Sequence, residues 1–164
     1  MELKVWIVNL SQYREDIGTY LLACFNLPVS YERLKDEIDL DESCEYKIDA
    51  VDHFPFEINE EMTIDEVNQL ARIYIDYMGS PFIHDLKWLA HYYFNGSPNH
   101  VLRNVEHFVY WSLEELENLI NEAKKHGTEL VDIAKEYEKK KSSGVIIGGS
   151  GNYLFTEDHA FSWV

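Results

Sequence analysis

The chain is poor in cysteine, proline and positive charge, and it has no long apolar segment. Only two of its 164 residues are Cys and four are Pro. Cys24 and Cys44 form no C-x-x-C pair and are too few for a disulfide framework, which favours a reducing cytosolic setting. No uncharged apolar run approaches the roughly 20 residues that cross a bilayer. The opening MELKVW has no signal-peptide cleavage site. We therefore expect a soluble cytoplasmic protein without membrane contact.

Lack of positive charge is the strongest of these features. Fourteen Lys and Arg face thirty Asp and Glu, so the formal net charge is −16. Such a surface repels nucleic acid and anionic membranes and attracts the proteins that bind them. The excess is concentrated in residues 32–66, here called the acidic stretch, which hold fourteen carboxylates against three basic residues. These carboxylates are Glu32, Asp36, Glu37, Asp39, Asp41, Glu42, Glu45, Asp49, Asp52, Glu57, Glu60, Glu61, Asp65 and Glu66.

The carboxylates are expected to lie on a folded scaffold. Hydrophobic residues make up 46% of the chain and aromatic residues 14%. Acidic disordered segments contain few aromatics, so this composition excludes an acidic tail. The length is compatible with one compact domain or with two or three small subdomains.

Residues 1–61 are expected to form a small antiparallel sheet with one helix. Residues 3–10 and 18–27 are rich in β-branched and aromatic residues and predict strands, with a polar loop over 11–16 between them. Ser30 can cap a short helix, and the alternation in 45–51 predicts a third strand.

Residues 62–106 are expected to be helical. Thr63 and Glu66 form a capping box that opens a helix ending at Gly79. Two Ser-Pro pairs, each an N-cap with proline at the first helical position, predict helices over 81–94 and 98–106.

Residues 107–164 are expected to form an α/β part, so the fold class is α+β. The predicted elements are a strand over 107–111, a helix from the capping box Ser112/Glu115 to Gly127, a helix after Thr128, a glycine-rich flexible loop over 144–151, and a hairpin of 153–155 with 160–163.

Metal sites are poorly supported by the spacing of the candidate ligands. His84 and His91 are seven residues apart, but no H-E-x-x-H or comparable cluster is present. Residues 39–45 are carboxylate-rich but lack the glycine and the closing glutamate of an EF-hand loop, so specific calcium binding is only an alternative. We expect no metal and no cofactor.

Catalytic signatures are also weak. The glycine-rich run lacks the G-K-[ST] of a phosphate-binding loop. No Ser–His–Asp, Cys–His or nucleophile-elbow pattern is visible, and nothing marks two carboxylates as a catalytic pair. We therefore expect a protein that is not an enzyme. An acidic enzyme would need a defined pocket, which the sequence does not locate.

The amount of charge is enough to occupy a DNA-binding cleft. Duplex DNA carries one charge per ~1.7 Å of its axis, so sixteen charges match roughly 27 Å of duplex. Only a folded scaffold can hold them in a fixed array. A solvated acidic surface of no specific use is the simpler alternative.

The order of several segments resembles the ArdA antirestriction family. The segments are 5–13 (VWIVNLSQY), 25–28 (FNLP), 45–49 (EYKID), 54–56 (FPF) leading into 63–70 (TIDEVNQL), 130–137 (LVDIAKEY) and 151–158 (GNYLFTED). The resemblance implies an elongated, acidic homodimer of three small subdomains that mimics bent B-form DNA. It implies that the protein occupies the DNA-binding groove of type I restriction–modification enzymes in a bacterial host cell.

Under this hypothesis the carboxylates of the acidic stretch contact the target, because they stand in for phosphates. A weaker second set lies in the C-terminal part. It comprises Glu114, Glu115, Glu117, Glu122, Glu129, Asp132 and Glu136.

Two departures from the family pattern leave an alternative open. Residues 1–78 carry a net charge of −12 and residues 79–164 only −4. Residues 89–105, where the family has an acidic helix at its dimer contact, are aromatic and almost uncharged. The alternative is an interaction module that inhibits another defence system, such as a CRISPR effector, through region 88–111. The candidate self-association residues are Trp88, Tyr92, Tyr93, Phe94 and Val101.

Overall fold

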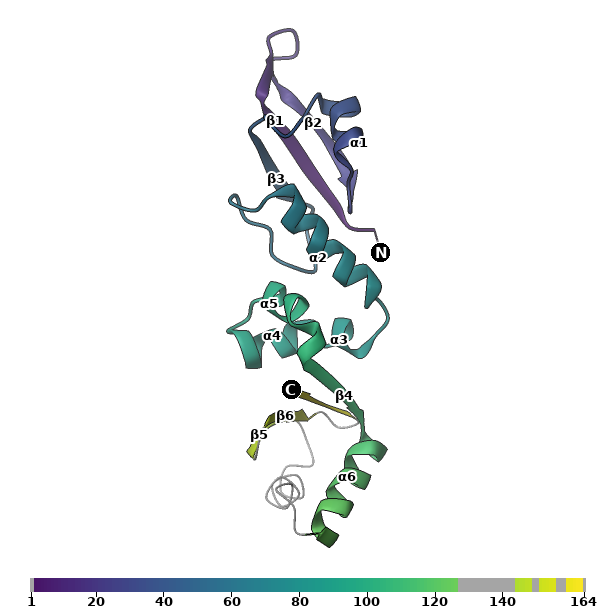
Figure 1. Ribbon diagram of the computed structural model, residues 1–164. Coiled ribbons are helices and arrows are strands. Elements are labelled where there is room, and N and C mark those ends of the chain that lie inside the picture. The colour runs from purple at the N-terminus through teal and green to yellow at the C-terminus, as the bar shows by residue number, and fades with distance from the viewer. Residues whose placement is uncertain (1, 127–143, 149–150, 156–158, 164) are drawn as a thin grey trace. The chain divides into compact units, whose positions relative to one another are not determined.

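The computed structural model describes residues 2–126, 144–148, 151–155 and 159–163 (Figure 1). They form a mixed α+β structure, which confirms the expected class. The chain divides into two compact units, Met1–Arg103 and Asn104–Val164. The expected boundary after residue 106 lies close to this division. A further division of the first unit after residue 61 stays a prediction.

The first unit opens with an antiparallel sheet of three strands. These are β1 (Lys4–Arg14), β2 (Thr19–Asn26) and β3 (Tyr46–Ala50), in the order β2-β1-β3. Strand β1 runs through much of the region predicted to be a polar loop. A register shift between Asn9 and Tyr13 accommodates the extra residues and lets Tyr13 pair with Tyr20. The Tyr13 and Tyr20 rings lie edge to face with centroids 5.2 Å apart.

Helix α1 (Tyr31–Ile38) covers the inner face of this sheet. Its N-cap is Ser30, as predicted, and the Ser30 hydroxyl accepts a hydrogen bond from the Arg33 N–H at 3.3 Å. Leu34 and Ile38 are fully buried, as are Val5, Ile7 and Phe25 of the sheet, which makes one core. Figure 1 shows the helix beside β2.

Helix α2 (Ile64–Asp76) begins with the predicted capping box. The Thr63 hydroxyl accepts from the Glu66 N–H at 3.1 Å, and the Glu66 carboxylate accepts from the Thr63 N–H at 3.0 Å. The Ile64 N–H donates to the Tyr46 hydroxyl at 2.9 Å, which joins the start of α2 to β3. The helix ends with its C-cap at Tyr77, two residues before the glycine expected to end it.

Three short helices complete the first unit: α3 (Pro81–His84), α4 (Leu86–Phe94) and α5 (Pro98–Arg103). The single helix predicted over 81–94 was wrong, because the backbone leaves helical geometry at Asp85 (φ −101°, ψ 16°). Aspartate is a weak former of helix interiors and favours termini. The helix predicted over 98–106 ends at Arg103, and a 3₁₀ turn follows over Val105–His107.

Buried asparagines tie the loops of this unit to its core. Asn68 accepts a hydrogen bond from the Val29 N–H and donates one to the Val29 carbonyl, each at 2.8 Å. Asn99 does the same for Glu57, at 2.9 and 2.8 Å. Asn9 donates to the Ile38 carbonyl at 2.9 Å and so fixes the end of α1. We call the first two arrangements asparagine clamps.

The second unit contains a four-stranded antiparallel sheet in the order β4-β7-β6-β5. Its strands are β4 (Phe108–Ser112), β5 (Gly144–Gly148), β6 (Gly151–Phe155) and β7 (His159–Trp163), and α6 (Leu113–His126) follows β4.

The terminal hairpin and the Ser112/Glu115 capping box of the second unit are confirmed. The flexible loop expected over 144–151 was wrong at its start, because β5 pairs with β6 from Gly144 opposite Phe155. Its central Val-Ile-Ile is β-branched and favours a strand. The helix predicted after Thr128 lies outside the described residues.

Candidate functional site

All fourteen carboxylates of the acidic stretch are exposed. They come from α1, from the turn that follows it, from the border strand β3, from the loop after β3, and from the first turn of α2. The positions of these elements that enter the core are apolar ones such as Leu34, Ile48 and Ile64, together with the amide side chain of Asn68. Six of the charges are carried by helices or strands, and the other eight lie in the turns and loops that join these elements.

The three basic residues of the stretch pair with few of these carboxylates. Arg33 contacts Glu37 at 3.0 Å, and Lys47 contacts Glu60 at 3.1 Å. Lys35 lies 2.7 Å from Asp39 and 3.8 Å from Asp41. Within the described part of the chain, the other members of the set have no ion pair shorter than 4.0 Å. These members are Glu32, Asp36, Glu42, Glu45, Asp49, Asp52, Glu57, Glu61, Asp65 and Glu66.

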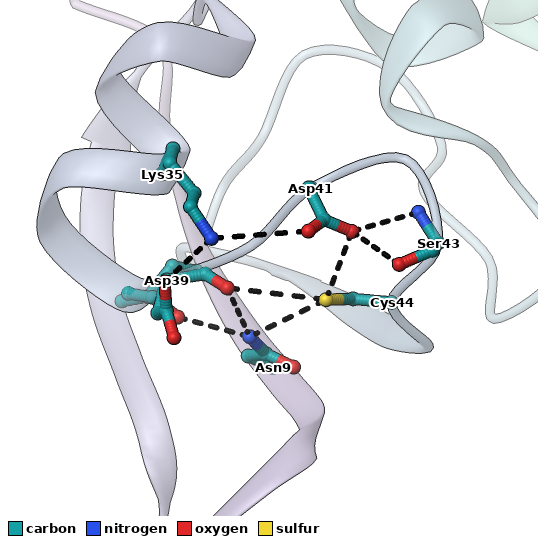
Figure 2. A network of polar contacts seen from close by, with 7 residues as sticks. Asn9, Lys35, Asp39, Asp41, Ser43 and Cys44 are labelled. Atoms are coloured by element: carbon teal, nitrogen blue, oxygen red, sulfur yellow. Dashed lines mark hydrogen bonds and ion pairs between the residues drawn. The ribbon is translucent and has the colours of Figure 1, made fainter.

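The turn after α1 is held by its own polar groups (Figure 2). The Asp41 carboxylate accepts from the Ser43 hydroxyl, from the Ser43 N–H at 2.9 Å and from the Cys44 thiol at 3.4 Å. These bonds, the Ser43 hydroxyl first, lower the pKa of Asp41 below its usual range. Asp41 therefore stays ionised at neutral pH. Among the residues that the structure describes, no three His, Cys, Asp or Glu lie close enough to hold a metal ion.

Part of the second acidic set is placed on α6. Glu114, Glu115, Glu117 and Glu122 are all exposed on this helix. The Glu115 carboxylate also caps the helix by accepting from the Ser112 N–H at 3.0 Å. Glu129, Asp132 and Glu136 lie outside the described residues. The acidic stretch lies in the first unit and the second acidic set in the second unit.

The residues predicted for self-association do not form one exposed patch. Val101 is 1% exposed, so its inclusion was wrong: it packs in the core that α4 and α5 build with Leu89 and Leu102. Trp88, Tyr93 and Phe94 are half-buried. Tyr92 is 46% exposed, and its ring contacts Trp88 edge to face with centroids 5.6 Å apart. A partner contact through this region stays a prediction.

Burial of Tyr93 predicts a response to alkaline pH. Burial raises the pKa of Tyr93 to about 12. Because the folded pKa lies above the unfolded value of about 10, the contribution of neutral Tyr93 to stability is complete below pH 10 and is lost as the pH rises towards 12. We expect Tyr93→Phe to extend the folded range upwards in pH. Unfolding at pH 9 to 12, followed by circular dichroism, checks this, with the exposed Tyr92→Phe as control. Equal stability of the two variants at alkaline pH would contradict the inference that ionisation of buried Tyr93 destabilises the fold.

A surface that the sequence analysis missed lies on the outer face of the first sheet. Trp6 and Leu22 are each 44% exposed and Leu10 is 39% exposed. The signal is present in residues 3–10, where apolar residues occupy both alternating sets of positions although only one set enters the core.

One small cavity lies between the start of β1 and the loop after β3. Its volume is about 180 Å³, and its lining includes Glu2, Lys4, Asp52 and His53. His53 has a left-handed backbone (φ 65°). No hydrogen bond between His53 and these two carboxylates is present in the described residues.

Comparison with known proteins adds no family assignment. No protein-family model matches the chain, and no curated protein matches it significantly. None of the helices among the described residues combines the length and apolarity needed to cross a membrane. The functional interpretation therefore depends on the surface itself.

Proposed function

We propose that this protein is a DNA mimic that blocks restriction. It occupies the DNA-binding groove of a type I restriction–modification enzyme in the cytoplasm of a bacterial cell. The observation that supports this proposal is the acidic stretch: fourteen exposed carboxylates on two helices, one strand and the turns and loops that join them, most of them without an ion pair.

The proposed mechanism requires no catalysis. A groove that binds DNA presents Lys and Arg to phosphates, and carboxylates fixed in space can pair with the same side chains. Association releases the counter-ions of both surfaces, so it weakens as salt rises. The ordered scaffold contributes because it spares the entropy of arranging the charges at binding. The resemblance implies that a homodimer provides a longer array.

Competition with DNA at several salt concentrations tests the proposal. A purified type I methylation complex is incubated with labelled duplex DNA, and this protein is titrated in. We expect full displacement of the DNA, with an apparent affinity that falls at least about tenfold between 50 and 200 mM salt. Poly-glutamate of matched charge is the control and is expected to compete poorly, because it lacks a fixed array. Simultaneous binding of DNA and protein, or binding unchanged by salt, would contradict the mechanism.

A further inference from the structure

The outer face of the β2-β1-β3 sheet is a second surface with its own chemistry. The inner face is covered, because Asn9 binds the end of α1 and Tyr46 binds the start of α2. Side chains alternate between the two faces of a strand. Most outer positions of β1 and β2 are therefore left exposed, whereas Val8 and Cys24 are half-buried.

These outer positions form a continuous apolar band. Val8 lies opposite Leu22, and Trp6 lies opposite Cys24. Farther along, the paired Tyr13 and Tyr20 continue it with their edge-to-face contact. We define the outer band as Trp6, Val8, Leu10, Tyr13, Tyr20 and Leu22. Five of its six members are large hydrophobic side chains that are at least 37% exposed. Such a continuous apolar surface is typical of a protein-binding site.

The border of the band along β3 carries negative charge. Asp49 lies opposite Trp6, and Lys47 lies opposite Val8. Glu45 lies beside Leu10, whose N–H donates to the Glu45 carbonyl at 2.8 Å. Lys47 pairs with Glu60 at 3.1 Å and also attracts Asp49, whereas Glu45 has no ion pair shorter than 4.0 Å within the described residues. The surface is thus apolar across two strands and acidic along one side.

We propose that the outer band binds an amphipathic helix of a partner protein that carries Lys or Arg along one flank. Two strands about 4.8 Å apart make a band roughly 10 Å wide, which matches the diameter of a helix. The apolar stripe of the helix packs on Trp6 and Leu22, and its basic flank pairs with Glu45 and Asp49. A second copy of this chain offers few basic side chains to pair with Glu45 and Asp49, since it has fourteen Lys and Arg against thirty Asp and Glu. Glu45 and Asp49 also belong to the acidic stretch, but the apolar contact with Trp6 and Leu22 is separate from it.

A synthetic peptide tests the surface directly. The probe is a labelled 18-residue helix with Leu at i, i+3, i+4 and i+7 and Lys on one flank, and its anisotropy is measured with the full chain. We expect binding that weakens at least about tenfold in the double variant Trp6→Thr/Leu22→Thr. Threonine keeps the β-propensity of the strands. The matched control is Ile75→Thr/Met78→Thr, because Ile75 is 41% and Met78 44% exposed at a different surface; it should bind normally.

Charge selection is tested with a second peptide in which Glu replaces each Lys. We expect it to bind at least about fivefold more weakly, and we expect Glu45→Gln/Asp49→Asn to remove that preference. Amide chemical-shift mapping on the unmutated protein gives a readout independent of any variant, and β1 and β2 should shift rather than the exposed side of α1. Absence of binding, equal binding to the Trp6/Leu22 variant, or equal binding of both peptides would overturn the inference. A dimer that dissociates in the Trp6/Leu22 variant would also overturn it, in favour of a second copy.

Discussion

Replacing six carboxylates of the acidic stretch together by their amides is expected to weaken target binding by about 100-fold. The positions are exposed, lack ion pairs in the described structure and lie apart from the capping box: Glu32, Asp36, Glu42, Asp52, Glu57 and Glu61. An exposed charge contact contributes about 0.5 kcal/mol, so six contribute about 3 kcal/mol, or two orders of magnitude in affinity. Any single replacement should change affinity only about twofold. Binding to the type I methylation complex at low salt is the measurement.

The control for this variant removes charge elsewhere. Amides at the exposed Glu2, Glu15, Asp76 and Glu106 remove four negative charges but leave the acidic stretch intact. We expect that control to bind within about threefold of the unmodified protein, because scattered exposed charges contribute little. Thermal unfolding should show both variants folded. If the variant with six amide substitutions binds the methylation complex as tightly as the unmodified protein, the acidic stretch is not the contact surface.

The second large effect is expected on stability. Asn68→Ala should lower the free energy of unfolding by about 2–4 kcal/mol, because it leaves the N–H and the carbonyl of Val29 buried without partners. Val29 and Asn68 are each 4% exposed, so water cannot easily replace the lost bonds. Chemical denaturation measures the change. A cost below about 0.5 kcal/mol would show that the loop relaxes and that the clamp is dispensable.

Asn99→Ala is the matched comparison, since it removes the same pair of bonds from Glu57. Glu57 is exposed, so water can satisfy its backbone groups after the substitution. We therefore expect a smaller cost, about 1 kcal/mol. A larger loss of unfolding free energy in Asn99→Ala than in Asn68→Ala would contradict the inference that burial of the partner backbone sets the loss.

Much of the first unit could be predicted because its signals are local. Alternation gave β3, and Ser30 and the Thr63/Glu66 capping box gave the starts of two helices. The continuation of β1 past Asn9 could not be predicted, because it depends on a bulge set by pairing with β2. The asparagine clamps left no local signal, since their partners lie 39 and 42 residues away.

Which side chains are exposed could be predicted for the charged residues but not for all of the apolar ones. The exposure of the acidic stretch follows from the high cost of burying an unpaired charge. The orientation of Val101 did not follow from its type, because an apolar residue on a short helix can face either the core or the surface. The outer band did not follow from the strand signals, because the same β-branched and aromatic residues predict a strand whichever face they occupy.

The asparagine clamps place different constraints on the two residues that they join. The asparagine is needed for the hydrogen bonds, whereas its partner contributes only backbone groups to them. In each clamp the asparagine side chain forms hydrogen bonds with the backbone of its partner residue. The side chain of Glu57, one of these partners, stays exposed. Mutations can therefore exchange surface charges there without loss of fold. Under the proposed function, such a scaffold permits rapid change of the exposed charges over a constant interior.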